Sequence, residues 1–262
     1  MRPLILIAND DGIYAPGIRT LVEIAREFGE VVVCTSDRSY SGKSHSVTFD
    51  RPLQIKESSV FADLGIKAYK TTGTPVDSVK LAIYEVIKRK PDLILSGINH
   101  GCNSSVNIFY SGTVAVVIEA AMHRIKSAAF SLATHNPNPD FSASEYYIPQ
   151  IIDFLINYPQ NIYLNVNIPN IPLSQIKGIR FARQDSGYWQ EKFVPFSHPV
   201  RDEKYFWLTG EMKSYEPENI ETDKWALDND YIAIVPLKVD MTDYEILNDI
   251  KNVEWASNKK RG

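Results

Sequence analysis

Two adjacent aspartates, Asp10 and Asp11, follow an apolar run at residues 4–8 and precede Gly12. Two carboxylates this close repel each other unless a cation lies between them or one of them binds a proton. Gly12 permits a backbone turn that lets both side chains face one point. The alternative is that one aspartate caps the next helix while the other is solvated. The pair therefore predicts a divalent metal site.

Two further polar loops follow apolar runs in the same way. The loop at residues 36–46 is rich in serine and contains Lys43, and hydroxyls with a basic residue beside a metal suit an oxyanion substrate. The loop at residues 96–111 contains Asn99 and Asn103, whose amide oxygens are neutral metal ligands. The alternatives are a solvated serine-rich turn in one loop and Asx turns in the other.

Ser111, Gly112 and Thr113 stand at the start of an apolar helix. The free N–H groups and the positive dipole end of a helix can bind an anion, although ordinary N-capping explains the same residues. The candidate ligands in the three loops are oxygens, which favours Mg²⁺ or Mn²⁺ over zinc or copper.

The elements that must position these loops are strands of a parallel sheet. Residues 4–8 and 30–35 are predicted strands, and a predicted helix at residues 18–28 connects them. Such a βαβ unit places its strands parallel, and residues 93–95 form a further buried strand. Ligands in open α/β sheets bind outside the carboxyl ends of the strands. We therefore expect the three loops to meet at one edge of the sheet.

The strict alternation of strands and helices is lost after about residue 176, where aromatic residues become dense. The pattern predicts hairpin strands at residues 179–184 and 204–208, a strand at 231–236 and a last helix at 243–253. Exposed aromatic residues on a hairpin are typical of an interface, and a second small core is the alternative. We expect an α/β metal-binding catalytic core at residues 1–176, and a hairpin and C-terminal oligomerisation segment at residues 177–262.

The bulk properties exclude several functional classes. A net charge of −4 and a pI near 5.8 give no basic surface for a nucleic acid polymer. No apolar run approaches the ~18 residues of a membrane span. Two cysteines are too few for a disulfide scaffold and fit a reducing compartment, so we expect a cytoplasmic protein.

Five motifs, taken in order, resemble the SurE survival-protein family. They are Asn9-Asp10-Asp11-Gly12 with Pro16-Gly17, Asp37-Arg38-x-x-Ser41-Gly42-x-x-x-Ser46, Thr71-Thr72-Gly73-Thr74-Pro75-x-Asp77, Ser96-Gly97-Ile98-Asn99-x-Gly101-x-Asn103, and Ser111-Gly112-Thr113-Val114. Ser104, Ser105 and Val106 depart from the family pattern, because a glycine and an acid are expected after Asn103.

The resemblance implies a Rossmann-like three-layer α/β fold with a mostly parallel sheet, a projecting β-hairpin and a swapped C-terminal segment. It also implies a homodimer or homotetramer. The activity it implies is that of a metal-dependent nucleotidase. The family's metal ligands fall here on Asp10, Asp11, Ser41 and Asn99, with one Mg²⁺ or Mn²⁺ expected per subunit.

Our hypothesis is hydrolysis of nucleoside 5′-monophosphates, with 3′-monophosphates as a further substrate. Asp10 and Asp11 are the expected catalytic residues, and the attacking water is activated by the metal or by one of the two aspartates. A covalent aspartyl-phosphate is the alternative to direct attack by water. The phosphate is expected to bind six residues: Asn9, Gly42, Asn103, Ser111, Gly112 and Thr113. The alternatives are a phosphatase or exopolyphosphatase with another phosphoester substrate, and a nucleotide- or metal-binding module without turnover.

Overall fold

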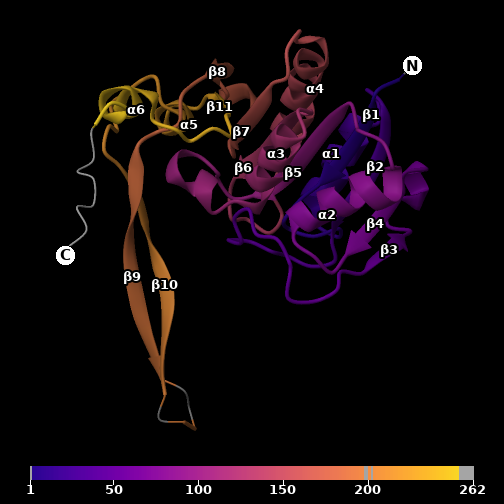
Figure 1. Ribbon diagram of the computed structural model, residues 1–262, viewed down its shortest axis with the longest axis horizontal. Helices are drawn as coiled ribbons and strands as arrows, with labels where there is room; N and C mark the ends of the chain where they lie inside the picture. The colour runs from indigo at the N-terminus through magenta and orange to yellow at the C-terminus, as the bar shows by residue number, and fades with distance from the viewer. Residues whose placement is uncertain (1, 198–199, 202, 254–262) are drawn as a thin grey trace, which may run out of the picture.

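The computed structural model describes residues 2–197, 200–201 and 203–253 of the chain. Its body has three layers, with a twisted sheet between two pairs of helices (Figure 1). The helices α1 (Pro16–Ala25) and α4 (Ser142–Asn157) cover one face. The other face carries α2 (Pro75–Leu81), which continues as a π-helix over Ala82–Ile87, and α3 (Gly112–Met122). The α/β three-layer fold expected from the sequence is confirmed.

The described residues form a sheet of nine strands in the order β3-β4-β2-β1-β5-β6-β7-β11-β8. The pairs β3–β4 and β7–β11 are antiparallel, and the other neighbouring pairs are parallel. The strand bounds are β1 Leu4–Ala8, β2 Glu30–Ser36, β3 Ile55–Ser58, β4 Lys67–Thr71, β5 Leu93–His100, β6 Lys126–Ala133, β7 Tyr163–Pro169, β8 Ile179–Phe181 and β11 Ile232–Pro236.

The core follows from the continuous apolar strands. All five residues of β1 are buried, because helices cover both faces of the sheet at this strand. The sheet also continues across the boundary expected near residue 176, since β11 pairs with β7 and β8 pairs with β11. The region after residue 176 therefore contributes to the same sheet as the N-terminal strands.

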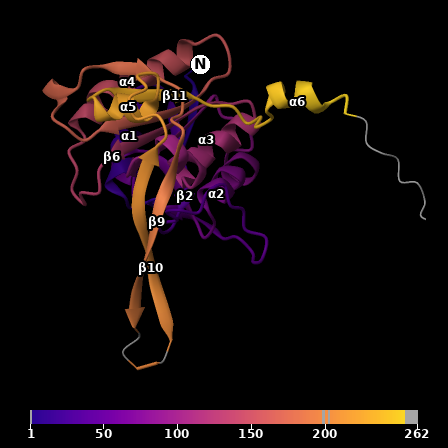
Figure 2. The same cartoon turned by 90° about the vertical axis from the view of Figure 1, so that its left-hand side faces the viewer.

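One of the two hairpin strands was predicted at the wrong residues, whereas the predicted strand at residues 204–208 lies within the hairpin. Its strands are β9 (Gly187–Ser197) and β10 (Lys204–Ser214), which pair with each other and project from the body (Figures 1 and 2). Residues 179–181 instead form β8, at the edge of the main sheet. The misplacement has a physical reason: most of β9 and β10 is exposed, so neither strand shows the alternation that a buried face would impose.

The third polar loop begins later than the sequence indicated. β5 continues through Ser96, Gly97 and Ile98 to His100, and Asn99 pairs with Ser131 of β6 after a register shift. A short 3₁₀ helix, Ser105–Phe109, then leads to α3. Asn99 therefore projects from a strand of the sheet, which is a more rigid support than a loop.

The C-terminal arm, residues 237–253, leaves the body after β11 and carries α6 (Tyr244–Ile250) away from it (Figure 2). Before β11 lies the short helix α5 (Asp223–Asp228), which the sequence pattern did not reveal. No helix in the described part of the chain is both long and apolar enough to span a membrane.

Candidate metal and phosphate site

Asp10 lies at the carboxyl end of β1 and is 4% exposed. Thr113 Oγ1, from the first turn of α3, donates a hydrogen bond to Asp10 Oδ1. A Cβ at Gly112 would lie 2.8 Å from Asp10 Cβ and 3.0 Å from Asp10 Oδ2, so only glycine lets the helix start approach this closely. The structure thus places a buried carboxylate directly against the N-terminus of α3.

Burial raises the pKa of Asp10 from 3.8 to about 6, because desolvation penalises its charged form. The hydrogen bond from Thr113 lowers the pKa and the negative charge of Asp11 raises it, so the net shift is upward. A cation beside this carboxylate would stabilise its ionised form and so lower its pKa.

Asp11 is less buried than Asp10 and contacts the end of β5. Its Oδ2 accepts a hydrogen bond of 3.0 Å from the backbone N–H of His100, and His100 Nδ1 lies 3.5 Å from the same oxygen. Among the described residues, His100 is the only basic side chain in an ion pair with either aspartate. The loop after β1 therefore meets the end of β5, which is part of the segment that the sequence predicted as the third polar loop.

Asn9 stabilises the turn between β1 and the aspartates. Its Oδ1 accepts hydrogen bonds from Gly12 N at 3.2 Å and Thr35 Oγ1 at 2.8 Å, and its Nδ2 donates to the carbonyl of Gly12 at 3.0 Å. The side chain is fully buried, and Gly12 has a φ of +94°. These contacts give Asn9 a role in shaping the turn.

The serine loop after β2 is held against both other parts of the site. Tyr40 N donates to the Asp10 carbonyl at 2.7 Å, and Ser44 N donates to the Tyr110 carbonyl at 3.1 Å. Ser41 is exposed, with its Oγ 3.0 Å from that of Ser39. Gly42 has open space where a Cβ would lie. The loop therefore borders the aspartates while presenting its hydroxyls to solvent.

Asn99 and Asn103 are both nearly buried, and each is held by hydrogen bonds. Asn99 Nδ2 donates to the Gly101 carbonyl at 2.9 Å, which fixes the orientation of its amide. Asn103 Nδ2 donates to Ser131 Oγ at 2.8 Å, and the Asn103 backbone N–H donates to Asn167 Oδ1 at 2.8 Å. Neighbouring strands thus fix the third loop.

Ser111 is the N-cap of α3, since its Oγ accepts a hydrogen bond of 3.1 Å from Val114 N. Capping by Ser111 and the bond from Thr113 to Asp10 place the first turn of α3 beside the carboxylate of Asp10. A helix start of this kind attracts anions through its N–H groups and its dipole. A negative carboxylate, which attracts a cation, therefore lies next to a positive helix end, which attracts a phosphate.

The donor set fits a hard cation. In the part of the chain that the structure describes, no group of three or more His, Cys, Asp or Glu side chains could hold a metal. An ion at this site would depend on two carboxylates and neutral oxygens, which suits a cation that prefers oxygen and retains water ligands. The burial of the Asp10 carboxylate, which raises its pKa to about 6, supports the same interpretation, because a cation would stabilise its ionised form.

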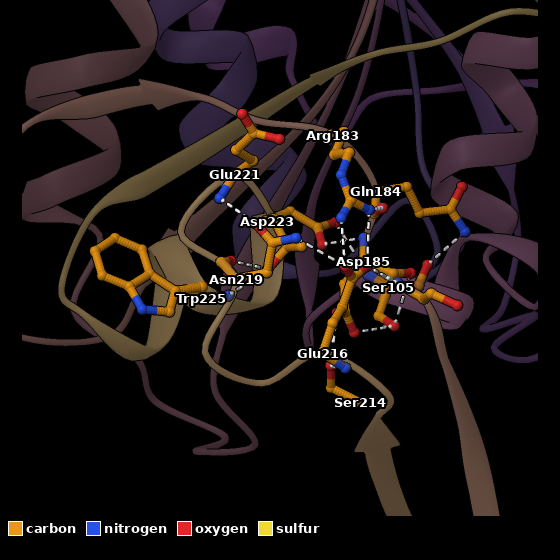
Figure 3. A network of polar contacts seen from close by, with 12 residues as sticks. Ser105, Arg183, Gln184, Asp185, Ser214, Glu216, Asn219, Glu221, Asp223 and Trp225 are labelled. Atoms are coloured by element: carbon orange, nitrogen blue, oxygen red, sulfur yellow. Dashed lines mark hydrogen bonds and ion pairs between the residues drawn. The ribbon is translucent and has the colours of Figure 1, made fainter.

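A network of buried acids that sequence reasoning missed supports the third loop (Figure 3). Asp223 accepts hydrogen bonds from the backbone N–H groups of Ser105 and Asp185 at 3.0 and 2.9 Å. Asp185 accepts from the hydroxyls of Ser105 and Ser214 at 2.8 and 2.7 Å. The root of the hairpin is thereby joined to the segment that follows Asn103. No local motif could reveal these aspartates, because their partners lie far away in the sequence.

The sequence matches the family model described as survival protein SurE over residues 5–191. The protein named 5′-nucleotidase SurE from Phocaeicola vulgatus is 44% identical over 253 residues, which cover 96% of each chain. The protein of the same name from Cytophaga hutchinsonii is 42% identical over 257 residues, or 97% of each chain.

A crystal structure of the SurE protein from Aquifex aeolicus has the same fold. It aligns with a TM-score of 0.79 at 36% sequence identity, covering 95% of the present chain and 98% of the Aquifex chain. The similarity therefore includes the sheet, the site loops and the region after residue 176.

Proposed function

This chain belongs to the SurE survival-protein family, and on that premise we propose that it is a metal-dependent 5′-nucleotidase. It hydrolyses nucleoside 5′-monophosphates to a nucleoside and inorganic phosphate. The observation that carries the proposal is the contact between Asp10 and the start of α3. A buried carboxylate can bind a cation, and a helix N-terminus beside it can bind the phosphate.

The residues that would hold the metal are Asp10, Asp11, Ser41 and Asn99. When bound, Mg²⁺ or Mn²⁺, at one ion per subunit, would polarise the phosphoryl group and offset the charge that develops on it. Asp10 and Asp11 supply the anionic ligands, while Asn99 and Ser41 supply neutral oxygens. The amide of Asn99 is oriented by its bond to Gly101, so its Oδ1 is the atom that can face the site.

The phosphate oxygens are placed against Gly42, Asn103 and the residues that begin α3: Ser111, Gly112 and Thr113. Gly42 leaves room for the phosphate, and the helix start donates N–H groups toward it. The sixth expected phosphate residue, Asn9, is assigned the different role of shaping the turn, because it is buried and bonded to Gly12 and Thr35.

One of the two aspartates accepts the proton of the attacking water. Asp10 is bonded to Thr113 and Asp11 to the backbone of His100, so each keeps a second carboxylate oxygen for this task. In-line hydrolysis needs the attacking water and the leaving oxygen on opposite sides of the phosphorus atom. Holding the water and the phosphate in this arrangement supplies much of the rate enhancement.

The same proposal includes a homodimer or homotetramer in the cytoplasm. The exposed apolar residues of α6, among them Ile246, Leu247 and Ile250, support assembly through the C-terminal arm. The aromatic side chains of the hairpin support a second contact. Both Cys34 and Cys102 are free thiols, as expected in a reducing compartment.

A substrate panel tests the proposed function. Phosphate release is measured with the four common nucleoside 5′-monophosphates, their 3′-isomers, ribose 5-phosphate and linear polyphosphate, each with Mg²⁺, with Mn²⁺ and with a chelator. We expect the 5′-monophosphates to be hydrolysed in a metal-dependent manner. A clear preference for polyphosphate would support the exopolyphosphatase alternative. Nucleotide binding without phosphate release from any compound would support the binding-module alternative.

A further inference from the structure

A hollow of about 470 Å³ lies between the hairpin and the serine loop. The hollow is formed from three parts of the chain. The serine loop contributes Gly42, the segment between the 3₁₀ helix and α3 contributes Tyr110, and the hairpin contributes Trp189, Glu191, Leu208 and Gly210. The volume falls within the range of sites for small ligands. The proposed metal and phosphate contacts do not use the aromatic residues of this hollow.

The indole of Trp189 is held in place. Its Nε1 donates a hydrogen bond of 2.9 Å to Asn107 Oδ1, and Asn107 belongs to the 3₁₀ helix that precedes α3. The network around Asp185 and Ser105 fixes the root of the same hairpin. The ring therefore lies at a defined position relative to the start of α3, although Trp189 remains 38% exposed.

Gly210 helps to form the hollow. In the antiparallel register Leu208, Gly210 and Met212 lie opposite Phe193, Glu191 and Trp189, so these six residues share one face of the hairpin. A Cβ at Gly210 would lie 2.5 Å from the Gln190 carbonyl, and its φ is +155°. Only glycine fits this close approach to β9, and this face therefore carries no side chain between Leu208 and Met212.

The hollow adjoins the proposed phosphate position at two points. Gly42 lines it and is also proposed to contact the phosphate, while Tyr110 immediately precedes the cap residue Ser111. The hydrogen bond from Ser44 N to the Tyr110 carbonyl ties these two edges together. A substrate whose phosphate lies at the helix start would direct its remaining part toward the hollow.

We propose that this hollow is the nucleoside subsite, where the base of a nucleoside monophosphate stacks against Trp189 and Tyr110. The inference rests on the proposed function and names the part of the protein that distinguishes a nucleotide from other phosphate esters. Aromatic rings stack on any base, so the subsite accepts several bases. Glu191 supplies an acceptor for hydroxyl or amino hydrogens at the same hollow.

A larger cavity of about 630 Å³ runs along α3 and also includes Ser111. Leu237, Val239 and Met241, from the start of the C-terminal arm, form one side of it. Among the described residues that line it there is no tryptophan, tyrosine or Gly42. It reaches the phosphate position through Ser111 and includes the ring of Phe109, but most of the described residues that line it are aliphatic, and none of them is a tryptophan or tyrosine on which a base could stack.

Kinetics with two substrates that differ only in the base test the inference. The variants Trp189→Ala and Tyr110→Ala are compared with the wild type on adenosine 5′-monophosphate and on ribose 5-phosphate. We expect each variant to raise KM for adenosine 5′-monophosphate about 5- to 150-fold, while kcat/KM for ribose 5-phosphate changes less than about threefold. Trp189→Phe keeps a ring and is expected to retain most of the affinity.

Trp207→Ala is the matched control. Trp207 is 70% exposed and lies on the opposite face of the same hairpin, so its loss should leave both substrates unaffected. Equal losses on both substrates in Trp189→Ala, or the same KM change in Trp207→Ala, would overturn the subsite.

Binding of adenosine, measured by calorimetry, distinguishes a failure of the subsite from a failure of the proposed function. Adenosine affinity should fall in Trp189→Ala and Tyr110→Ala but not in Trp207→Ala. If the wild type releases phosphate from neither compound, the proposed function fails, and adenosine binding still decides the subsite. If the wild type hydrolyses adenosine 5′-monophosphate while the variants bind adenosine as it does, the subsite alone fails.

Discussion

Asp10 combines a buried carboxylate, a like-charged neighbour and a hydrogen bond from Thr113. Burial and the charge of Asp11 raise its pKa to about 6, so ionisation of Asp10 opposes folding when no cation is bound. The sequence already indicated this conflict, because the two aspartates are adjacent. It could not indicate which carboxylate is buried, since that depends on α3 packing from a distant part of the chain.

The first prediction concerns the stability of the metal-free protein. Asp10 has a folded pKa above its usual value of 3.8, so its penalty is absent below that pH and complete above about pH 6. With a chelator present, Asp10→Asn should raise the free energy of unfolding by about 1–3 kcal/mol at pH 8. The gain should shrink at pH 5. Urea unfolding measures both values, and a variant that is less stable at pH 8 would contradict the assignment.

The second prediction concerns Gly112. A methyl group there would meet the Asp10 side chain at 2.8 to 3.0 Å, so Gly112→Ala must displace the helix start or the carboxylate. A misplacement of about 1 Å in an active site can lower the rate on the order of 100-fold. We expect a loss of that size in kcat/KM with the fold intact. Steady-state kinetics measures the loss, and thermal unfolding controls for folding. Wild-type kcat/KM would show that this contact is irrelevant.

At the scale of elements, the strands with continuous apolar runs were predictable because burial on both faces demands such runs. β1 and β2 appear close to their expected residues. The end of β5 was not predictable, because Ser96 and Gly97 are typical of a loop. Only pairing with β6 keeps this segment in the sheet. The first strand of the hairpin was misplaced, and only the beginning of the second was found, because these exposed strands lack the alternation of a buried face.

The elements around the serine loop meet at Glu119, a buried residue of α3. Its carboxylate lies 2.6 Å from Lys80 Nζ of α2, 3.3 Å from His45 Nε2 of the serine loop and 3.2 Å from His123 Nε2. Burial by itself would raise the pKa of Glu119, but the close contact with His45, the hydrogen bond from Lys80 and the charge of Lys80 outweigh it and lower the pKa to about 2. The cluster holds the loop to two helices.

The third prediction follows from this depressed pKa. The contribution of Glu119 to stability is complete above its usual pKa of 4.5 and is lost as the pH falls toward about 2. Glu119→Gln should therefore destabilise the protein by about 2–3 kcal/mol at pH 7, and by less at pH 3.5. Urea unfolding at the two pH values checks this. A difference that does not change with pH would contradict the role of the charge.

At the scale of the whole molecule, two parts extend from the body and expose apolar side chains. The hairpin exposes Phe193, Phe196 and Trp207, and α6 of the C-terminal arm exposes Ile246 and Ile250. Apolar surfaces of this kind are typical of sites that another chain covers. The density of aromatic residues in the sequence led to the expectation of an interface at the hairpin. The position of the arm required the structure, because a short amphipathic helix carries no signal of where it docks.

The fourth prediction tests assembly. The double variant Leu247→Asp and Ile250→Asp places two charges on the exposed apolar side of α6 and should dissociate the oligomer at micromolar concentration. Light scattering coupled to size exclusion measures the mass, with Asp249→Asn on the same helix as the control. A wild-type protein that elutes as a monomer would contradict the proposed assembly, and an unchanged mass of the double variant would exclude α6 as the contact.

The central claim is that Asp10 and Asp11 hold a metal ion that is required for the hydrolysis of nucleoside 5′-monophosphates. The most direct measurement is release of phosphate from adenosine 5′-monophosphate by the wild type and Asp10→Asn, each with Mn²⁺ and with a chelator. Asp63→Asn, at an exposed ion pair with Arg19, is the matched control. We predict activity only in the wild type and the control, and only with metal, with a loss in Asp10→Asn on the order of 100-fold or more. Full activity of Asp10→Asn, or activity of the wild type that a chelator leaves unchanged, would contradict the account.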